Sequence, residues 1–131
     1  MITLCREAHK RLDVIDVMQL LNGQKNLSGM DMRGLTLSDI DFSSASLYHA
    51  QLDNTNMKSI VAHKANFRGA SMRGADLTGA DLSGADLRDC DLTNANLSRS
   101  NLTGAQMGGA KLKNVCAEGV TLKEADLCHA T

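Results

Sequence analysis

Residues 75–89 read ADLTGADLSGADLRD, three consecutive copies of one five-residue unit. The same five-residue repeat extends far beyond this stretch. Every fifth residue from Leu27 to Leu127 is a medium-to-large apolar residue or, twice, an alanine. A second series of mostly small residues precedes the first by two positions. A repeat this regular is considered before any local propensity, since it determines the architecture of the whole chain.

A period of five fits neither of the regular secondary structures. An α-helix turns about 100° per residue, so steps of five would scatter the apolar residues over all of its faces. A straight strand alternates its faces, so an odd step would send successive apolar residues to opposite sides. The chain is therefore expected to bend once in every repeat.

Each unit predicts a short extended side followed by a corner. In Ala75-Asp76-Leu77 the two apolar residues are two positions apart, which points both to one side of an extended segment. The next two residues are mostly turn formers such as glycine, aspartate and asparagine. Four right-angle corners close a square, and stacked squares pair at the inter-strand spacing of about 4.8 Å. The 21 repeats then give about five coils and a rod roughly 25 Å long.

The position of Phe42 favours four sides per coil. With four sides Phe42 stacks on Ala62, so a large residue lies beside a small one and the core volume is conserved. With five sides it would stack on Phe67 and pair the only two phenylalanines. The absence of proline from the sequence also agrees, since each side must donate N–H groups to neighbouring coils.

The units from residues 65–69 (ANFRG) to residues 105–109 (AQMGG) resemble the A(D/N)LXX consensus of the pentapeptide-repeat proteins. The resemblance covers about residues 25–131 and implies an all-β solenoid, a right-handed quadrilateral β-helix of about five coils of four units. Two stretches, residues 59–66 and 113–120, depart from the consensus, and local distortion of their coils is expected.

Residues 3–22 precede the repeats and have the pattern of an amphipathic helix, which Asn22-Gly23 would stop. An open coil exposes unpaired backbone and core side chains, so a solenoid needs a cap. We therefore divide the chain into a helical cap, residues 1–24, and a β-helix, residues 25–131; a partner-binding or dimerising helix is the alternative. The apolar positions of the helix recur at three- and four-residue steps: Leu4, Ala8, Leu12, Ile15, Met18 and Leu20 or Leu21.

The repeat continues through Ala125-Asp126-Leu127 almost to the last residue, so the sequence contains no second cap. The last coil is expected either to stack on a second copy as an end-to-end homodimer or to belong to a longer protein. Both alternatives stay open at this point.

The cysteines and histidines form no recognisable catalytic or metal-binding pattern. The four cysteines include no CxxC pair, and a square coil puts Cys116 and Cys128 on opposite sides. Cys90 occupies an alanine position and is expected to be buried. Cys128 and His129 are adjacent but have no third ligand or orienting group in the sequence. The prediction is a protein that is not an enzyme, with no cofactor, no metal and the reduced cysteines typical of the cytoplasm.

The charge is nearly balanced, with 14 Lys and Arg against 15 Asp and Glu. One branch of the pentapeptide-repeat family mimics DNA and modulates DNA gyrase, which demands dense negative charge. Here the aspartates at 76, 81, 86 and 91 fall on four different sides, so they form a belt around one coil. A DNA-mimicking modulator of DNA gyrase or topoisomerase is therefore the alternative function and not the favoured one. Direct nucleic-acid binding would need a basic excess and stacking aromatics, and no stretch is apolar enough to cross a membrane.

A rigid protein-interaction or scaffold module is the favoured function, because domains that resemble this one serve as adaptors for other proteins. Tyrosine and arginine are enriched at binding hot spots. The candidate protein-binding surface joins a mildly basic line on one side of the rod to a second line on the adjacent side: Tyr48, Arg68 and Arg88, then Arg33 and Arg73 with Asp53 between them. An ordinary solvated face with scattered charge is the alternative interpretation.

Overall fold

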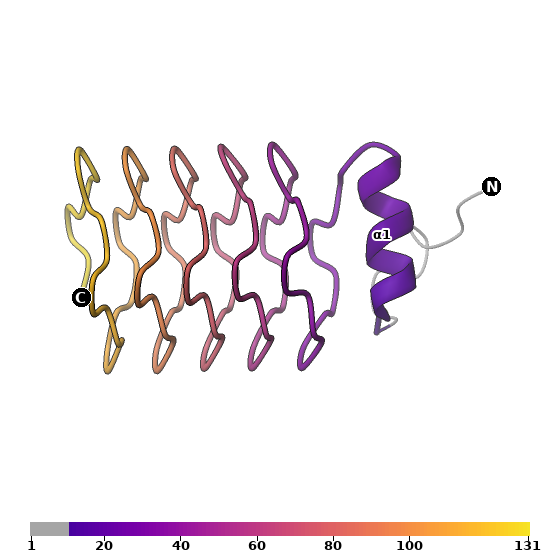
Figure 1. Cartoon of the computed structure of the whole chain (residues 1–131), viewed down its shortest axis with the longest axis horizontal. Helices are drawn as coiled ribbons and strands as arrows, with labels where there is room; N and C mark the ends of the chain where they lie inside the picture. The colour runs from indigo at the N-terminus through magenta and orange to yellow at the C-terminus, as the bar shows by residue number, and fades with distance from the viewer. Residues whose placement is uncertain (1–10) are drawn as a thin grey trace.

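The computed structural model describes residues 11–131, which form a rod of stacked coils with one helix, α1 (Val14–Asn22), across its end (Figure 1). The first residue of each side, from Asn26 to Gln106, forms a parallel bridge with the residue 20 positions later. A coil therefore has four sides, as the pairing of Phe42 with Ala62 predicts. Each side is bridged at one residue only, so residues 11–131 contain isolated β-bridges in place of the extended strands of an all-β fold.

Every backbone N–H of a typical repeat has a partner, and residues 76–80 show how. The N–H groups of Asp76, Leu77 and Gly79 donate to carbonyl oxygens of the neighbouring coils at 2.9, 2.8 and 3.0 Å. The N–H of Ala80 donates to the carbonyl of Leu77 within the corner, at 3.0 Å. The remaining N–H, that of Thr78, donates to the Asp76 carboxylate at 3.0 Å. A proline at most positions of such a repeat would remove one of these bonds.

The aspartate or asparagine of the consensus satisfies the one N–H that finds no carbonyl. Asp81 Oδ1 accepts from the N–H of Ser83, and Asn101 Oδ1 from that of Thr103, both at 3.0 Å. Such bonds from a short polar side chain to the backbone two residues later stabilise turns. The consensus at this position therefore reflects backbone satisfaction and does not by itself mark a binding site.

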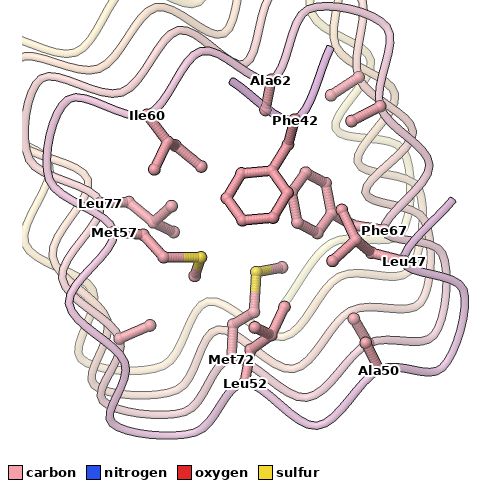
Figure 2. Packing of buried hydrophobic residues seen from close by; sticks show 14 of the residues in the cluster. Phe42, Leu47, Ala50, Leu52, Met57, Ile60, Ala62, Phe67, Met72 and Leu77 are labelled. Carbon is pink, nitrogen blue, oxygen red and sulfur yellow. The ribbon is translucent and has the colours of Figure 1, made fainter. Parts of the chain in front are cut away.

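The core fills the inside of the coils. Phe42, Leu47, Leu52 and Met57 project inwards from the four sides of one coil, and Ala62 follows on the side of Phe42 (Figure 2). Cys90 is fully buried, as predicted, and its thiol donates to a core carbonyl at 2.8 Å. Burial raises the pKa of Cys90 to about 12, so this thiol packs as a small neutral group.

The corners follow a packing rule along the rod. Each corner contains a residue with positive φ, and where this residue has a side chain and the corner of the next coil is a glycine, the side chain leans over that glycine. His49 leans over Gly69, where a Cβ atom would lie 2.6 Å from the imidazole, and Asp89 leans over Gly109, also at 2.6 Å. Glycine at these positions is therefore required by a close approach as well as by φ.

Replacing Gly69 with alanine should lower the free energy of unfolding by more than the same change at Gly104. Both glycines have positive φ, 71° and 68°, but nothing lies within 4 Å of a Cβ at Gly104. The φ penalty is about 1 kcal/mol and common to both, so the excess at Gly69 measures the clash with His49. Urea denaturation checks this, and in a His49→Ala background the change Gly69→Ala should cost no more than Gly104→Ala costs in the wild type. An equal loss for both single variants would contradict the rule.

The two stretches that depart from the consensus are not distorted. Val61 bridges residues on both neighbouring coils, Asp41 and Asp81, and Cys116 bridges Asn96. The predicted local distortion is therefore wrong, because the bridges need only the backbone and the inward-facing positions. Ala62 keeps its place in the core although it is small.

Helix α1 begins later than the apolar pattern predicts. Asp13 is its N-cap and exchanges hydrogen bonds with Asp16 in a capping box, at 2.8 and 3.0 Å. Arg11 precedes the helix and is bridged to Asp31, so helix is excluded there. The predicted segment from residue 3 to residue 10 lies outside the described residues. The predicted end is right, since the helix stops at Asn22.

The buried face of α1 also differs from the prediction. Val17 and Leu20 are buried and join the core at the end of the rod, together with Leu12. Ile15 and Met18, which the pattern placed inwards, are 69% and 46% exposed. Within residues 11–131 no helix has the length and apolar character needed to cross a membrane.

Candidate functional site

The predicted surface residues lie on two adjacent sides of the rod. The bridges of Asn66 with Ser46 and Asp86 align three sides, so their third residues, Tyr48, Arg68 and Arg88, follow one another along the rod. Parallel bridges likewise align Arg33, Asp53 and Arg73 on the next side. The period of 20 thus places each candidate where the sequence predicts it.

The arginines of this surface are paired with carboxylates. Arg88 contacts Asp86 through two bonds, Nη2–Oδ2 at 2.6 Å and Nε–Oδ1 at 2.9 Å. Arg68 Nε lies 3.6 Å from Asp89 Oδ2. The line of Tyr48, Arg68 and Arg88 was expected to be mildly basic, and that expectation is wrong. It considered only residues 20 positions apart, and each guanidinium has an acidic neighbour outside that series.

The adjacent side repeats the arrangement. Arg33 holds Asp31 through two bonds at 2.8 and 2.9 Å, and Arg73 Nε lies 3.9 Å from Asp91 Oδ2. The Asp53 carboxylate accepts a hydrogen bond from the backbone N–H of Arg73 at 2.9 Å. A bidentate pair fixes the plane of a guanidinium but leaves some of its five N–H donors for a partner.

The pairs with arginine stabilise the ionised carboxylates. The hydrogen bond from the Arg88 side chain lowers the pKa of Asp86 below its ordinary value, against the opposing effect of burial. The Arg33 side chain lowers the pKa of Asp31 in the same way. A carboxyl whose pKa is lower in the folded state stabilises the fold above its unfolded pKa, and this contribution is lost as the pH falls through the folded pKa.

The variant Asp86→Asn should be less stable than the wild type at neutral pH and equally stable in acid. Asparagine keeps the Oδ1 acceptor for the N–H of Arg88, as Asn66 does for Arg68 at 2.9 Å. The change therefore removes the charge alone, and the gap should close below the unfolded carboxyl pKa of about 3.9. Urea titrations at neutral and acid pH measure this difference in unfolding free energy. Asp81→Asn is the control, because it removes a carboxylate that is bonded to Ser83 and not to an arginine. A gap that persists in acid would contradict the ion-pair explanation.

An exposed aromatic pair lies beside these ion pairs. Tyr48 is 44% exposed and makes a T-shaped contact with His49, with ring centroids 4.2 Å apart and ring planes at 87°. His49 and Asp89 occupy alternate corners of the same edge of the rod, and sequence reasoning missed both as members of the surface. The signal was present, since glycines alternate with larger residues at steps of 20 along this edge.

Two polar hollows lie at the far edge of the Arg33 side. The first, of about 430 Å³, is lined by Arg11, Arg33, Gly34, Asp53 and Asn54. The second, of about 300 Å³, shares Asp53 and Asn54 and adds Arg73, Gly74 and Asn94. Gly34 and Gly74 contribute only backbone to the lining of these hollows.

The cluster of Asp81, Ser83 and His63 does not match the chemistry of an activated nucleophile. Ser83 Oγ donates to Asp81 at 2.6 Å and lies 2.9 Å from His63 Nδ1. With the hydroxyl proton directed to Asp81, the imidazole can only donate to this serine, which is the reverse of base activation. Within residues 11–131 no three His, Cys, Asp or Glu side chains gather as a metal site would require.

Comparison with known families finds a match over most of the rod. The profile described as Pentapeptide repeats matches in eight copies, over residues 26–58, 62–94, 80–116 and 90–127. A comparison with curated proteins found no match.

Several solved structures are similar. A pentapeptide repeat protein from the thylakoid lumen of Arabidopsis thaliana has 40% sequence identity and a TM-score of 0.71, over 72% of this chain and 66% of that one. Rfr23, from the cyanobacterium Cyanothece 51142, has 26% identity and a TM-score of 0.56, over 86% and 93%. A protein from Nostoc Pcc 7120, with 22% identity and a TM-score of 0.53, is alike in fold alone, over 85% and 96%.

Proposed function

The chain belongs to the pentapeptide-repeat family, and from this premise we propose that it is a non-catalytic, rigid protein-interaction or scaffold module. The supporting observation is one continuous surface on two adjacent sides of the rod, which we call the two-sided surface. It combines an exposed aromatic pair, fixed arginines and polar hollows: Tyr48, His49, Arg68, Arg88, Asp89, Arg33, Asp53 and Arg73. The same membership supports right-handed winding of the coils as part of the proposal.

Rigidity makes such a surface suitable for recognition. Binding a partner costs free energy for each side chain and backbone segment that must be ordered. Here Arg33 and Arg88 are already held by Asp31 and Asp86, and the backbone beneath them is bridged to the coils on both sides. A preorganised mixture of donors, acceptors and an aromatic group is typical of a surface that binds another protein.

The charge pattern favours a protein partner over DNA mimicry. The mimicry alternative needs unpaired acidic side chains, because it must reproduce a phosphate field. Five carboxylates of this rod instead lie within 4 Å of a cationic side chain: Asp31, Asp76, Asp86, Asp89 and Asp91. The described cysteines are all free thiols, which supports a reducing compartment such as the cytoplasm.

A comparison of retained proteins tests the proposal. Wild-type protein, the variant Tyr48→Ala/Arg68→Glu and the control Arg99→Glu are immobilised, and proteins bound from an extract of the source organism are quantified by mass spectrometry. Arg99 lies at the corner diagonally opposite the two-sided surface, and Arg88 is left intact because it holds Asp86 through two hydrogen bonds. A partner should bind the wild type and the control but not the double variant. The affinity of the purified partner for the three purified forms should follow the same order.

Two outcomes would contradict the proposal. Retention of the same proteins by all three forms, with unchanged circular dichroism, would remove the two-sided surface from consideration. Inhibition of gyrase supercoiling by the purified protein would favour the DNA-mimicking alternative.

A further inference from the structure

The Arg33 side of the rod presents a line of alternating charges. Parallel bridges at steps of 20 place Arg33, Asp53 and Arg73 at the same position of three successive coils. The side chains of Arg33 and Arg73 are 52% and 60% exposed, whereas the aspartates that pair with them are only 10% and 26% exposed. From outside the rod, the line therefore has the order cation, anion, cation.

The space between these charges is open. A polar hollow of about 430 Å³ is lined by Arg33 and Asp53, and a second, of about 300 Å³, by Asp53 and Arg73. Arg11 also lines the first hollow, where its guanidinium lies over Gly34 and donates to the Arg33 carbonyl. Two cations therefore border the first hollow and one the second, and both hollows share Asp53. Side chains of a partner can enter either hollow and contact charges that are already in place.

Each charged group of the line keeps hydrogen-bonding capacity for a partner. Arg33 uses Nε and one N–H of Nη2 for its ion pair, which leaves the donors of Nη1. Arg73 has only a loose ion pair, at 3.9 Å, and keeps its donors. Asp53 receives two bonds on Oδ1, from the Ser71 hydroxyl at 2.5 Å and the Arg73 backbone N–H at 2.9 Å. Its Oδ2 accepts no hydrogen bond from residues 11–131, so this oxygen is available to a cation.

The alternation of sign selects against a partner with charge of one sign. A phosphate backbone or an anionic membrane surface would be attracted by Arg33 and Arg73 but repelled by Asp53 between them. A partner with the order anion, cation, anion would meet an opposite charge at all three positions. Such complementarity is what gives a charged interface its specificity and its register.

The spacing of the line favours a helix over an extended segment. Coils are about 4.8 Å apart, so the line spans about 10 Å from Arg33 to Arg73. On an α-helix, residues i, i+4 and i+7 share one face and span about 10.5 Å at 1.5 Å per residue. In an extended segment every second side chain shares a face, so three of them span about 13 Å and overshoot the line.

We infer that the Arg33 side binds an α-helix of the partner protein, laid along the rod, with acidic residues at i and i+7 and a basic residue at i+4. The first acidic side chain enters the hollow of Arg11 and Arg33. The basic side chain binds Asp53, and the second acidic side chain binds Arg73. This inference rests on the proposed function and specifies the segment that one side of the two-sided surface recognises.

Covalent capture of designed peptides tests the inference without the natural partner. Three peptides of equal charge are compared: a helix with Glu, Lys and Glu at i, i+4 and i+7, the same helix with the order Lys, Glu, Glu, and an extended segment with Glu, Lys and Glu at i, i+2 and i+4. A carbodiimide joins carboxylates to amines without a spacer, and mass spectrometry measures the yield of the bond between the peptide lysine and Asp53. At low ionic strength the first helix should be captured about tenfold more than the other two, because only it matches all three charges.

Two variants show whether the whole line takes part. Arg73→Gln should lower the capture of the first helix about threefold, because one glutamate loses its partner while Asp53 keeps its bond to the backbone N–H of residue 73. Lys64→Gln, at the corner diagonally opposite the two hollows, is the control and should leave the yield unchanged.

Three outcomes would overturn the inference. They are equal capture of the two helices, stronger capture of the extended segment, and an Arg73→Gln yield equal to that of the wild type or of no lower value than that of Lys64→Gln. Because no natural partner takes part, such a failure is distinct from failure of the proposed function, which the retention of proteins from an extract decides.

Discussion

The variant Phe42→Ala should lose about 3–5 kcal/mol of unfolding free energy, the range observed when a buried phenylalanine is truncated. Phe42 is fully buried, and its neighbour in the next coil on the same side is Ala62, which is too small to fill the space. Chemical denaturation of the purified variant, followed by circular dichroism, measures the loss.

A double-mutant cycle shows whether the two residues share one volume. Ala62→Leu alone should overfill the coil and cost about 1–3 kcal/mol, while Phe42→Ala/Ala62→Leu should be more stable than Phe42→Ala alone. Leu102→Ala/Ala62→Leu is the matched control, because Leu102 lies two coils from Ala62 on the same side and its effect should be additive. Additivity in the Phe42 cycle as well would contradict the shared volume.

A proline at Val61 should cost at least about 3 kcal/mol, whereas a proline two residues later, at His63, should have little effect. The N–H of Val61 donates to the carbonyl of Ile40 at 3.0 Å, and proline would remove this bond and leave the carbonyl unpaired. His63 occupies the second position of a turn whose next residue, Lys64, has φ 59°, the type II geometry in which proline is common.

The contrast depends on a gap in the consensus. Val61 stands where most repeats have Asp or Asn, so it offers no side-chain acceptor, and the N–H of His63 has no bond to lose among the described residues. Thermal and urea unfolding of the two variants make the comparison within one repeat. Equal destabilisation would mean that the turn, and not the hydrogen bond, excludes proline.

The sequence predicted the coil because its strongest signal, the spacing of leucine and alanine, is also what packs the core. The Phe42–Ala62 pair favoured four sides, since a narrow core conserves volume locally, and the bridges at steps of 20 confirm the number. Helix α1 was harder to predict. Apolar residues at three- and four-residue steps are compatible with more than one choice of buried face in a short helix. Leu12, which was included in the pattern, lies before the first residue of α1. The Asp13 and Asp16 capping box was the available signal for its start.

The surface was predicted in its columns but not in its contacts. The pairing of Arg88 with Asp86 could have been foreseen, because residues two apart on one extended side point the same way. The pairing of Arg68 with Asp89 and the contact of Tyr48 with His49 could not, because they depend on how side chains at positive-φ corners lean along the rod.

The four-sided coil has a consequence for how such a protein can change in length. Adding or deleting a single five-residue unit leaves every leucine facing the core. Made between Tyr48 and Arg68, the same change turns everything beyond it by one side, which moves Arg68 and Arg88 away from Tyr48 and onto the neighbouring side. Only whole coils of 20 residues can be gained or lost without scrambling the exterior. The pattern of core residues therefore has a period of five, while a surface that binds a partner along one side of the rod has a period of 20.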